Sequence, residues 1–171
     1  SVVNALSEKL KLTVFRNNKT YYVEFKNGKA SSPLKVIGKS KKTGTKINFL
    51  PSKEIFSDTK FSSSIVNKRM KELAFLNKGI KITIIDNISS KPKEIINKYD
   101  GGINEFVEFL DDKREKLVNK NSNNLFKKPI SVEGSKNKVV IECALKWNAG
   151  YNEDVLAFTN NIHQRDGGTH L

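Results

Sequence analysis

The dipeptide Asn27-Gly28 constrains the fold of this chain more than any other feature. Both residues tolerate the left-handed backbone of a two-residue hairpin turn, so the pair predicts adjacent antiparallel strands on either side. Residues 10–15 and 20–26 alternate apolar and polar side chains, and Asn17-Asn18 turns the chain between them. This region is therefore expected to form an antiparallel sheet with one apolar face and one solvent-exposed face.

Two further strands are expected to complete this sheet. Residues 34–37 form a short apolar run, and residues 45–50 alternate again before Pro51, which cannot continue a central strand. Together with the two earlier strands, they predict an antiparallel meander of four strands.

A helix is expected to cover the meander. Apolar residues recur at helical spacing between Lys60 and Asn77, and Gly79 is well placed to end the helix. Packing of this apolar stripe on the meander predicts a two-layer α/β sandwich. Residues 80–84 alternate as a further strand, and residues 95–96 are expected to pair back on it as a short edge.

The character of the sequence changes at residues 100–102, where a basic region ends at a pair of glycines. Residues 103–110 predict a short amphipathic helix, and residues 139–147 alternate cleanly as a strand. We therefore place a domain junction here, with one domain at residues 1–100 and the beginning of a second, rich in strands, at residues 101–171.

The formal net charge is +13, and all of the excess lies in the first hundred residues. Residues 1–100 carry 21 Lys and Arg against 8 Asp and Glu, whereas residues 101–171 carry 10 of each. The excess could be an electrostatic footprint for DNA or for nucleotide phosphates. It could equally be compositional, because 27 of the 31 cations are Lys, which binds phosphate as a point charge and reads no bases.

The cellular setting follows from what the sequence contains. There is no apolar run long enough to cross a membrane and no charged-then-apolar leader. Cys143 is the single cysteine, which excludes an internal disulfide and suits a reducing cytoplasm. The alternating pattern around Cys143 predicts a core position for it rather than a nucleophilic role.

Common catalytic constellations are missing. His163 and His170 are the only histidines, and neither has a second ligand at metal-binding spacing. No Ser-His-Asp set and no GxxxxGK[ST] loop can be placed. The adjacent carboxylates Asp111-Asp112 and Glu153-Asp154 are expected on solvated elements with unshifted pKa values.

Two stretches carry candidate binding residues. Residues 41–49, KKTGTKINF, predict a cationic turn that leads into a strand with Ile47 and Phe49 on one face. Residues 1–7, SVVNALS, predict a short helix that begins at Ser1. Serine at a helix start caps the first backbone N–H groups, and the same groups can instead hold phosphate.

Five motifs in order then carry a resemblance that covers essentially the whole chain. They are SVVNALSEKLKL, KKTGTKINFLPS, KELAFLNKGIKI, GGINEFVEFL and FTNNIHQRDGGTHL. The chain resembles the DNA gyrase B family of type II topoisomerases, whose N-terminal half belongs to the ATPase class shared with heat-shock chaperones, histidine kinases and MutL. The resemblance implies the C-terminal part of the ATPase domain at residues 1–100. It implies the start of the transducer domain, an α+β fold like that of a ribosomal protein, at residues 101–171.

The resemblance assigns roles by position. Ser1 matches the first residue after the glycine-rich ATP lid, at a helix whose N-terminus faces the phosphates. Thr45 matches a threonine that helps to hold adenine, and Ile47 matches an aliphatic wall of the same pocket. Arg16 matches a rim arginine that contacts aminocoumarin inhibitors.

The resemblance also implies what accompanies these residues. ATP and Mg²⁺ are the expected cofactors, with the catalytic glutamate, the magnesium ligand and the lid before Ser1. Because the chain starts at Ser1 inside a helical pattern, we expect an internal piece that is inactive alone. The expected partners are DNA and DNA gyrase A, in a cytoplasmic heterotetramer that holds two copies each of gyrase A and gyrase B. The alternatives are the topoisomerase IV counterpart of gyrase B and a non-enzymatic basic nucleic-acid-binding α/β module.

Overall fold

The computed structural model describes residues 2–88 and 91–164 of the chain. The Cα positions divide the chain into two compact units, Ser1–Phe61 and Ser62–Leu171, and each is described by itself. Helices and sheets occur together along the chain, which confirms the predicted mixed α/β class.

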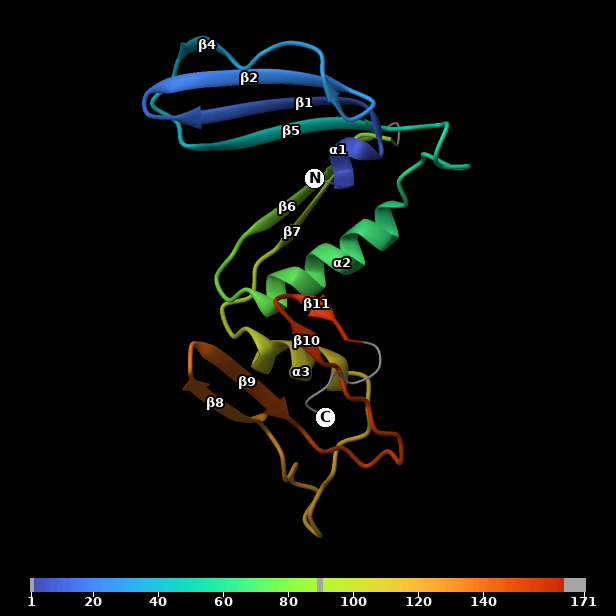
Figure 1. The fold of residues 1–171 in the computed structure, drawn as a ribbon. Helices are drawn as coiled ribbons and strands as arrows, with labels where there is room; N and C mark the ends of the chain where they lie inside the picture. Colours follow the sequence, from blue (N-terminus) through green and yellow to red (C-terminus); the bar gives the residue numbers. More distant parts are fainter. Residues whose placement is uncertain (1, 89–90, 165–171) are drawn as a thin grey trace. The chain divides into compact units, whose positions relative to one another are not determined.

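The first unit is built on one antiparallel sheet. Its strands run in the order β3-β2-β1-β5, and β4 also pairs with β2 (Figure 1). The elements of this unit are α1 (Val2–Ala5), β1 (Ser7–Arg16), β2 (Lys19–Lys26), β3 (Lys29–Ala30), β4 (Lys35–Lys39) and β5 (Gly44–Pro51).

Both predicted turns of this sheet are present. Asn17 and Asn18 join β1 to β2 with φ values of 53° and 57°, and Asn27 and Gly28 join β2 to β3 at 47° and 78°. Positive φ at both central residues is the geometry that matches the right-handed twist of hairpin strands. The hairpin predicted from the Asn-Gly pair is therefore confirmed.

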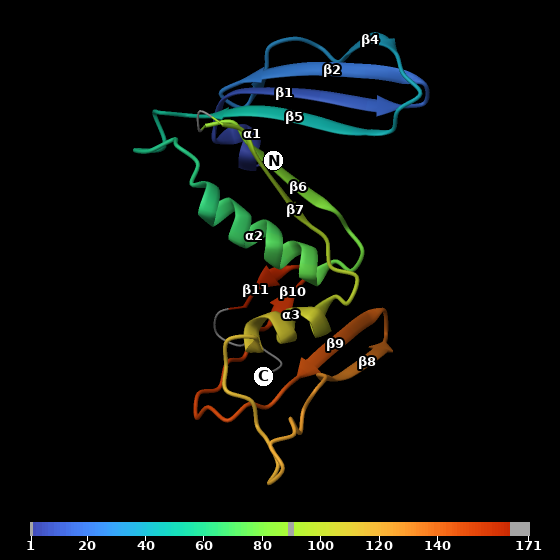
Figure 2. The same ribbon diagram turned by 180° about the vertical axis from the view of Figure 1, so that it is seen from behind.

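The predicted meander is wrong in one respect, because β5 pairs with β1 and not with its neighbour in sequence, β4. In the β1–β5 register, Ile47 lies opposite Leu12 and Phe49 lies opposite Leu10. This pairing gathers the apolar residues of the two strands on one face, which a pairing chosen by sequence order alone does not consider. Seen from behind, β5 again lies beside β1 (Figure 2).

The long helix of the second unit, α2 (Ser63–Leu76), agrees closely with the helix predicted between residues 60 and 77. Its C-cap residue Asn77 donates a side-chain hydrogen bond to the Leu73 carbonyl at 2.7 Å, and Gly79 follows with φ of 79°. The helix packs on β6 (Ile82–Asp86) and β7 (Lys93–Asn97), which pair antiparallel as predicted. This helix was predicted to cover the meander, whereas the sheet that it covers within the second unit is the β6–β7 pair.

An aromatic cluster forms the core of the second unit. Phe75 of α2 is only 1% exposed. Its ring stacks on Tyr99 with centroids 3.6 Å apart and on Phe106 at 4.9 Å. Phe106 belongs to α3 (Ile103–Asp111), the amphipathic helix that the sequence predicts. The cluster joins α2 to α3.

The remaining strands are short ribbons. They are β8 (Ile130–Lys136), β9 (Val139–Leu145), β10 (Phe158–Thr159) and β11 (Ile162–His163). The strand β9 confirms the strand predicted at residues 139–147, but Cys143 on β9 is exposed and the core position predicted for it is wrong. Alternation shows that a strand has two different faces and does not show that either face is covered.

The predicted junction near residue 100 lies within the second compact unit. Compactness in space is a different criterion from membership of a domain family, so the domains at 1–100 and 101–171 stay a prediction. In the described part of the chain, no helix is both long enough and apolar enough to cross a membrane.

Candidate functional site: one face of the first sheet

The residues predicted from the KKTGTKINF stretch share one face of the sheet. Thr45 lies opposite Val14, and Ile47 lies opposite Leu12. Residues directly opposite each other in an antiparallel pair point to the same side, and side chains along a strand alternate. Arg16, two residues beyond Val14, therefore joins Thr45 and Ile47 on this face, which we call the Thr45 face.

The Thr45 face offers a hydroxyl beside aliphatic side chains. Ile47 is 57% exposed and Phe49 is 41% exposed, while Leu12 and Val14 are half-buried between the neighbouring strands. Gly44, with φ of 145° and no atom within 4 Å of an added Cβ, lets the preceding loop turn sharply into β5. A flat ligand with a polar edge fits such a surface, because the aliphatic wall excludes water and the hydroxyl gives direction.

The opposite face is polar and internally paired. The Glu24 carboxylate receives hydrogen bonds from Lys9 and from the Tyr22 hydroxyl, each at 2.8 Å. The hydrogen bond from Lys9, followed by that from Tyr22, holds the pKa of Glu24 below its usual value. This cluster is occupied with its own contacts, which leaves the Thr45 face as the binding candidate.

The helix predicted at residues 1–7 is shorter than expected. It spans Val2–Ala5, and Ser7 already belongs to β1 and donates its hydroxyl to the Val3 carbonyl at 2.6 Å. Ser1, the predicted phosphate-side residue, lies outside the described residues, so that role stays a prediction.

A cavity of about 280 Å³ lies at the Pro51 end of β5. Phe49 contributes to it, and its ring meets Phe61 edge-to-face at 6.0 Å. Val3 and Leu6, beside α1, line another part of it. Because alternate residues on β5 point the same way, this apolar hollow continues the Thr45 face along the strand.

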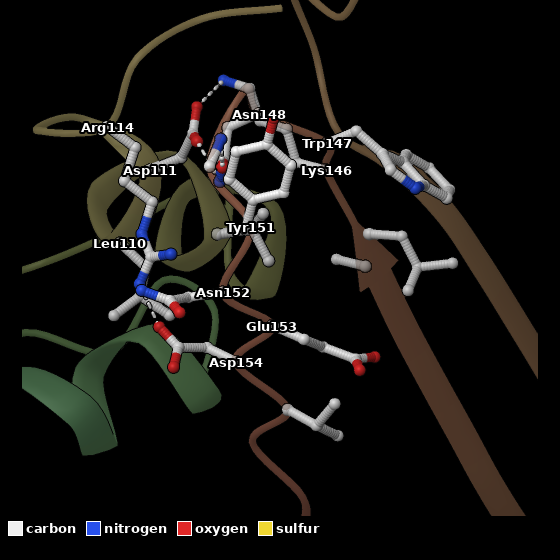
Figure 3. Close-up of a pocket in the computed structure, with 15 residues that line it drawn as sticks. Leu110, Asp111, Arg114, Lys146, Trp147, Asn148, Tyr151, Asn152, Glu153 and Asp154 are labelled. Atoms are coloured by element: carbon white, nitrogen blue, oxygen red, sulfur yellow. Dashed lines mark hydrogen bonds and ion pairs between the residues drawn. The ribbon is translucent and has the colours of Figure 1, made fainter.

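A second cavity, of about 400 Å³, belongs to the second unit and contains none of the predicted site residues (Figure 3). Asp111 on its wall is 4% exposed. It accepts contacts from Lys116 at 2.8 Å, from Lys146 at 3.1 Å and from Asn148 at 3.2 Å. Arg114 pairs with Asp154 nearby, and the Glu153 side chain extends away from both ion pairs (Figure 3).

The prediction of a solvated Asp111 with an unshifted pKa is therefore wrong. Burial alone would raise the pKa of Asp111, but hydrogen bonds from Lys116, Lys146 and Asn148 outweigh it and hold the pKa below its usual value. Lys146 and Asn148 lie beyond the end of β9, more than thirty residues away in sequence. A local reading of Asp111-Asp112 contains no signal of these partners. The charged groups around Asp111 pair with one another and help to hold the unit together.

No metal centre is formed by the described residues, since no three His, Cys, Asp or Glu side chains come together in a suitable group. His163, on β11, packs against Phe158 of β10, with the two ring centroids 5.2 Å apart. His170 lies outside the described residues.

Known proteins are similar to this chain over almost its whole length. A family model described as DNA gyrase B matches residues 102–171. The chain is 43% identical over 171 residues to the gyrase B protein of Streptococcus pyogenes serotype M3, covering 99% of this chain and 25% of that protein. It is 41% identical over 175 residues to the gyrase B protein of Rickettsia felis, covering 100% of this chain and 20% of that protein.

A solved structure is similar over nearly the same extent. It is the crystal structure of the 43K ATPase domain of Thermus thermophilus gyrase B in complex with an aminocoumarin. The TM-score is 0.83 at 34% sequence identity, with 99% of this chain and 44% of that chain covered. The chain spans at most about a quarter of the length of the curated relatives described above.

Proposed function

The chain belongs to the DNA gyrase B family, and on this premise we propose that its Thr45 face forms one wall of an adenine pocket. The protein that contains it would be an ATP-dependent type II topoisomerase that negatively supercoils DNA by double-strand passage. The observation that carries the proposal is the placement of Thr45 and Ile47 on one apolar strand face, in register with Val14 and Leu12.

The chemistry of this face suits a purine. The Thr45 hydroxyl can donate to or accept from a polar edge of the base, directly or through water. Ile47 and its neighbours supply an aliphatic surface against the flat ring. Arg16, on the same face and exposed, would contact an inhibitor such as an aminocoumarin at the rim of the pocket.

Other parts of the machinery complete the proposal. The site of ATP hydrolysis, including the Mg²⁺ ligands, would come from residues that this chain does not supply. Ser1 would sit at the phosphate side. Residues 101–171 would begin the transducer, and the protein would work in the cytoplasm on DNA together with gyrase A. ATP would bind the closed form of the assembly better than the open form. Because of this difference in affinity, ATP binding would drive the cycle.

The test is a pair of threonine variants in the full-length protein. Thr45→Ala removes the hydroxyl on the Thr45 face, whereas Thr43→Ala makes the same chemical change in the loop before β5. We expect at least a tenfold loss of ATP affinity for Thr45→Ala, equivalent to about 1.4 kcal/mol, and little change for Thr43→Ala. Equal ATP affinities for the two variants would refute the adenine assignment.

A further inference from the structure

Three cations stand side by side across three neighbouring strands of the first sheet. The register pairs Arg16 of β1 with Lys19 of β2, and Lys19 with Lys39 of β4. Residues paired in this way share a face, so the three side chains form a row across the sheet. We call this row the cation ladder.

The loop between β4 and β5 adds two more cations to the same end of the sheet. The Ser40 backbone N–H donates to the Asn18 carbonyl at 3.2 Å, which ties the loop to the turn beside the cation ladder. The Ser40 hydroxyl in turn accepts from the Lys42 N–H at 3.1 Å. Lys41 and Lys42 therefore begin at Ser40, which these hydrogen bonds hold beside Lys39.

No carboxylate balances this group in the first unit. From Lys9 to Lys46 the sequence contains eleven Lys and Arg residues and a single acidic residue, Glu24. The Glu24 carboxylate is engaged with Lys9 and Tyr22 on the opposite face. Among the described residues, the side chains of the cation ladder and of Lys41 and Lys42 have no ion-pair partner, and all five are exposed.

Such an arrangement works against folding. Like charges directly opposite each other on adjacent strands repel, and a sheet gains nothing from placing three of them in a row. The repulsion disappears when an extended polyanion lies across the strands. Neighbouring strands are about 4.8 Å apart, so the row presents positive charge at short, regular steps.

We propose that the cation ladder, with Lys41 and Lys42, is a docking surface for the phosphate backbone of duplex DNA. Four of the five side chains are lysines, which contact phosphate as point charges without reading bases, so the binding would be independent of sequence. A single nucleotide would engage only part of a group spread over three strands and a loop. This inference rests on the proposed action on DNA and adds the surface that would contact it.

The experiment removes the lysines and leaves Arg16, which the preceding proposal places at the rim of the adenine pocket. In the full 171-residue chain, Lys19, Lys39, Lys41 and Lys42 are replaced together by Gln. A control variant replaces four exposed lysines of the second unit, Lys120, Lys127, Lys128 and Lys138, by Gln and so loses the same charge. Circular dichroism checks that both variants keep the fold of the unaltered chain.

Binding to a labelled DNA duplex is measured by fluorescence anisotropy between about 50 and 200 mM salt. Each neutralised phosphate contributes about 0.9 to the slope of log affinity against log salt. Loss of four phosphate contacts should lower the slope by about 3.6 for the ladder variant, and the slope should change little for the control. Equal slopes for the two variants, or a slope near zero for the unaltered chain, would overturn the proposal and leave the charge as a matter of composition.

The outcome is separable from that of the nucleotide proposal. In the full-length protein, the four ladder substitutions should leave ATP affinity within about twofold, whereas Thr45→Ala should not. Loss of DNA binding with intact ATP affinity supports the docking surface independently of the adenine assignment. Loss of ATP affinity in the ladder variant would show that these lysines serve the nucleotide and not DNA, and would overturn the docking surface.

Discussion

The two compact units use charge in opposite ways. Residues 1–61 carry 13 Lys and Arg against 4 Asp and Glu, and the cations at one end of their sheet have no partners among the described residues. Residues 62–171 carry 18 against 14, and the buried carboxylate of Asp111 is held by Lys116 and Lys146. The buried charge of the second unit is thus part of its packing, whereas the cation ladder of the first unit is exposed and available to bind an anion.

The units also differ in how they are held together. Among the described residues of the first unit, the buried apolar side chains are Leu10 and Val23, both within the sheet, and geometry at the turns fixes the register. In the second, Phe75 and Phe106 join two helices through stacked rings. We therefore expect the second unit to be sensitive to side-chain truncation in its core and the first to be sensitive to its turn backbone.

The largest effect is expected for Phe75→Ala. Removing a ring that is 1% exposed and stacked on two others leaves a cavity and should cost about 3–5 kcal/mol in the free energy of unfolding. Trp147, the single tryptophan, lies in the second unit and reports its unfolding by fluorescence in a denaturant titration. Ile65→Ala, on the same helix at a position 71% exposed, is the control and should cost less than about 0.5 kcal/mol. Similar losses for both variants would contradict the aromatic core.

Asp111→Asn should have the next largest effect. It leaves the buried Lys146 ammonium without its counter-charge, and breaking one side of a buried pair costs about 3 kcal/mol. Asp112→Asn alters the neighbouring exposed carboxylate and should be near neutral. The same fluorescence titration compares the two, and an Asp111→Asn variant as stable as Asp112→Asn would mean that the ion cluster contributes nothing.

Acid should weaken the second unit through the same residue. Because the pKa of Asp111 is lowered in the folded chain, its contribution is fully present above the unfolded-state value of about 3.9. That contribution is lost as the pH falls further, through the lowered folded pKa. Unfolding free energies measured by Trp147 fluorescence from about pH 5 downward should fall for the unaltered chain and fall less steeply for Asp111→Asn. Parallel curves would assign the acid sensitivity to other groups.

The smallest effect tests the first unit. Gly28→Ala places a Cβ at a φ of 78° and 3.3 Å from the Ala5 Cα, so we expect a loss of about 1–2 kcal/mol. Gly38→Ala is the matched control, because nothing lies within 4 Å of its added Cβ and its φ is ordinary. Hydrogen exchange of the β1 and β2 amides measures both variants. A stable Gly28→Ala sheet would show that the turn does not set the register.

Local signals in the sequence were sufficient for the elements. The Asn27-Gly28 turn, the helix around Phe75 and the strand β9 were predicted because turn chemistry and side-chain period depend only on neighbouring residues. The placement of Thr45 and Ile47 on one strand face follows from the same period, and the family follows from motifs whose order is itself a property of the sequence.

The tertiary structure alone decided which residues distant in sequence lie next to each other. The pairing of β5 with β1, the row of Arg16, Lys19 and Lys39, and the burial of Asp111 by Lys146 each depend on which segments meet in space. Each is set by apolar faces and charges that must be satisfied together, and no single stretch of sequence carries that information. The sequence by itself therefore determined the elements, the family and the face proposed for adenine, while the fold decided which charges are paired and which remain available.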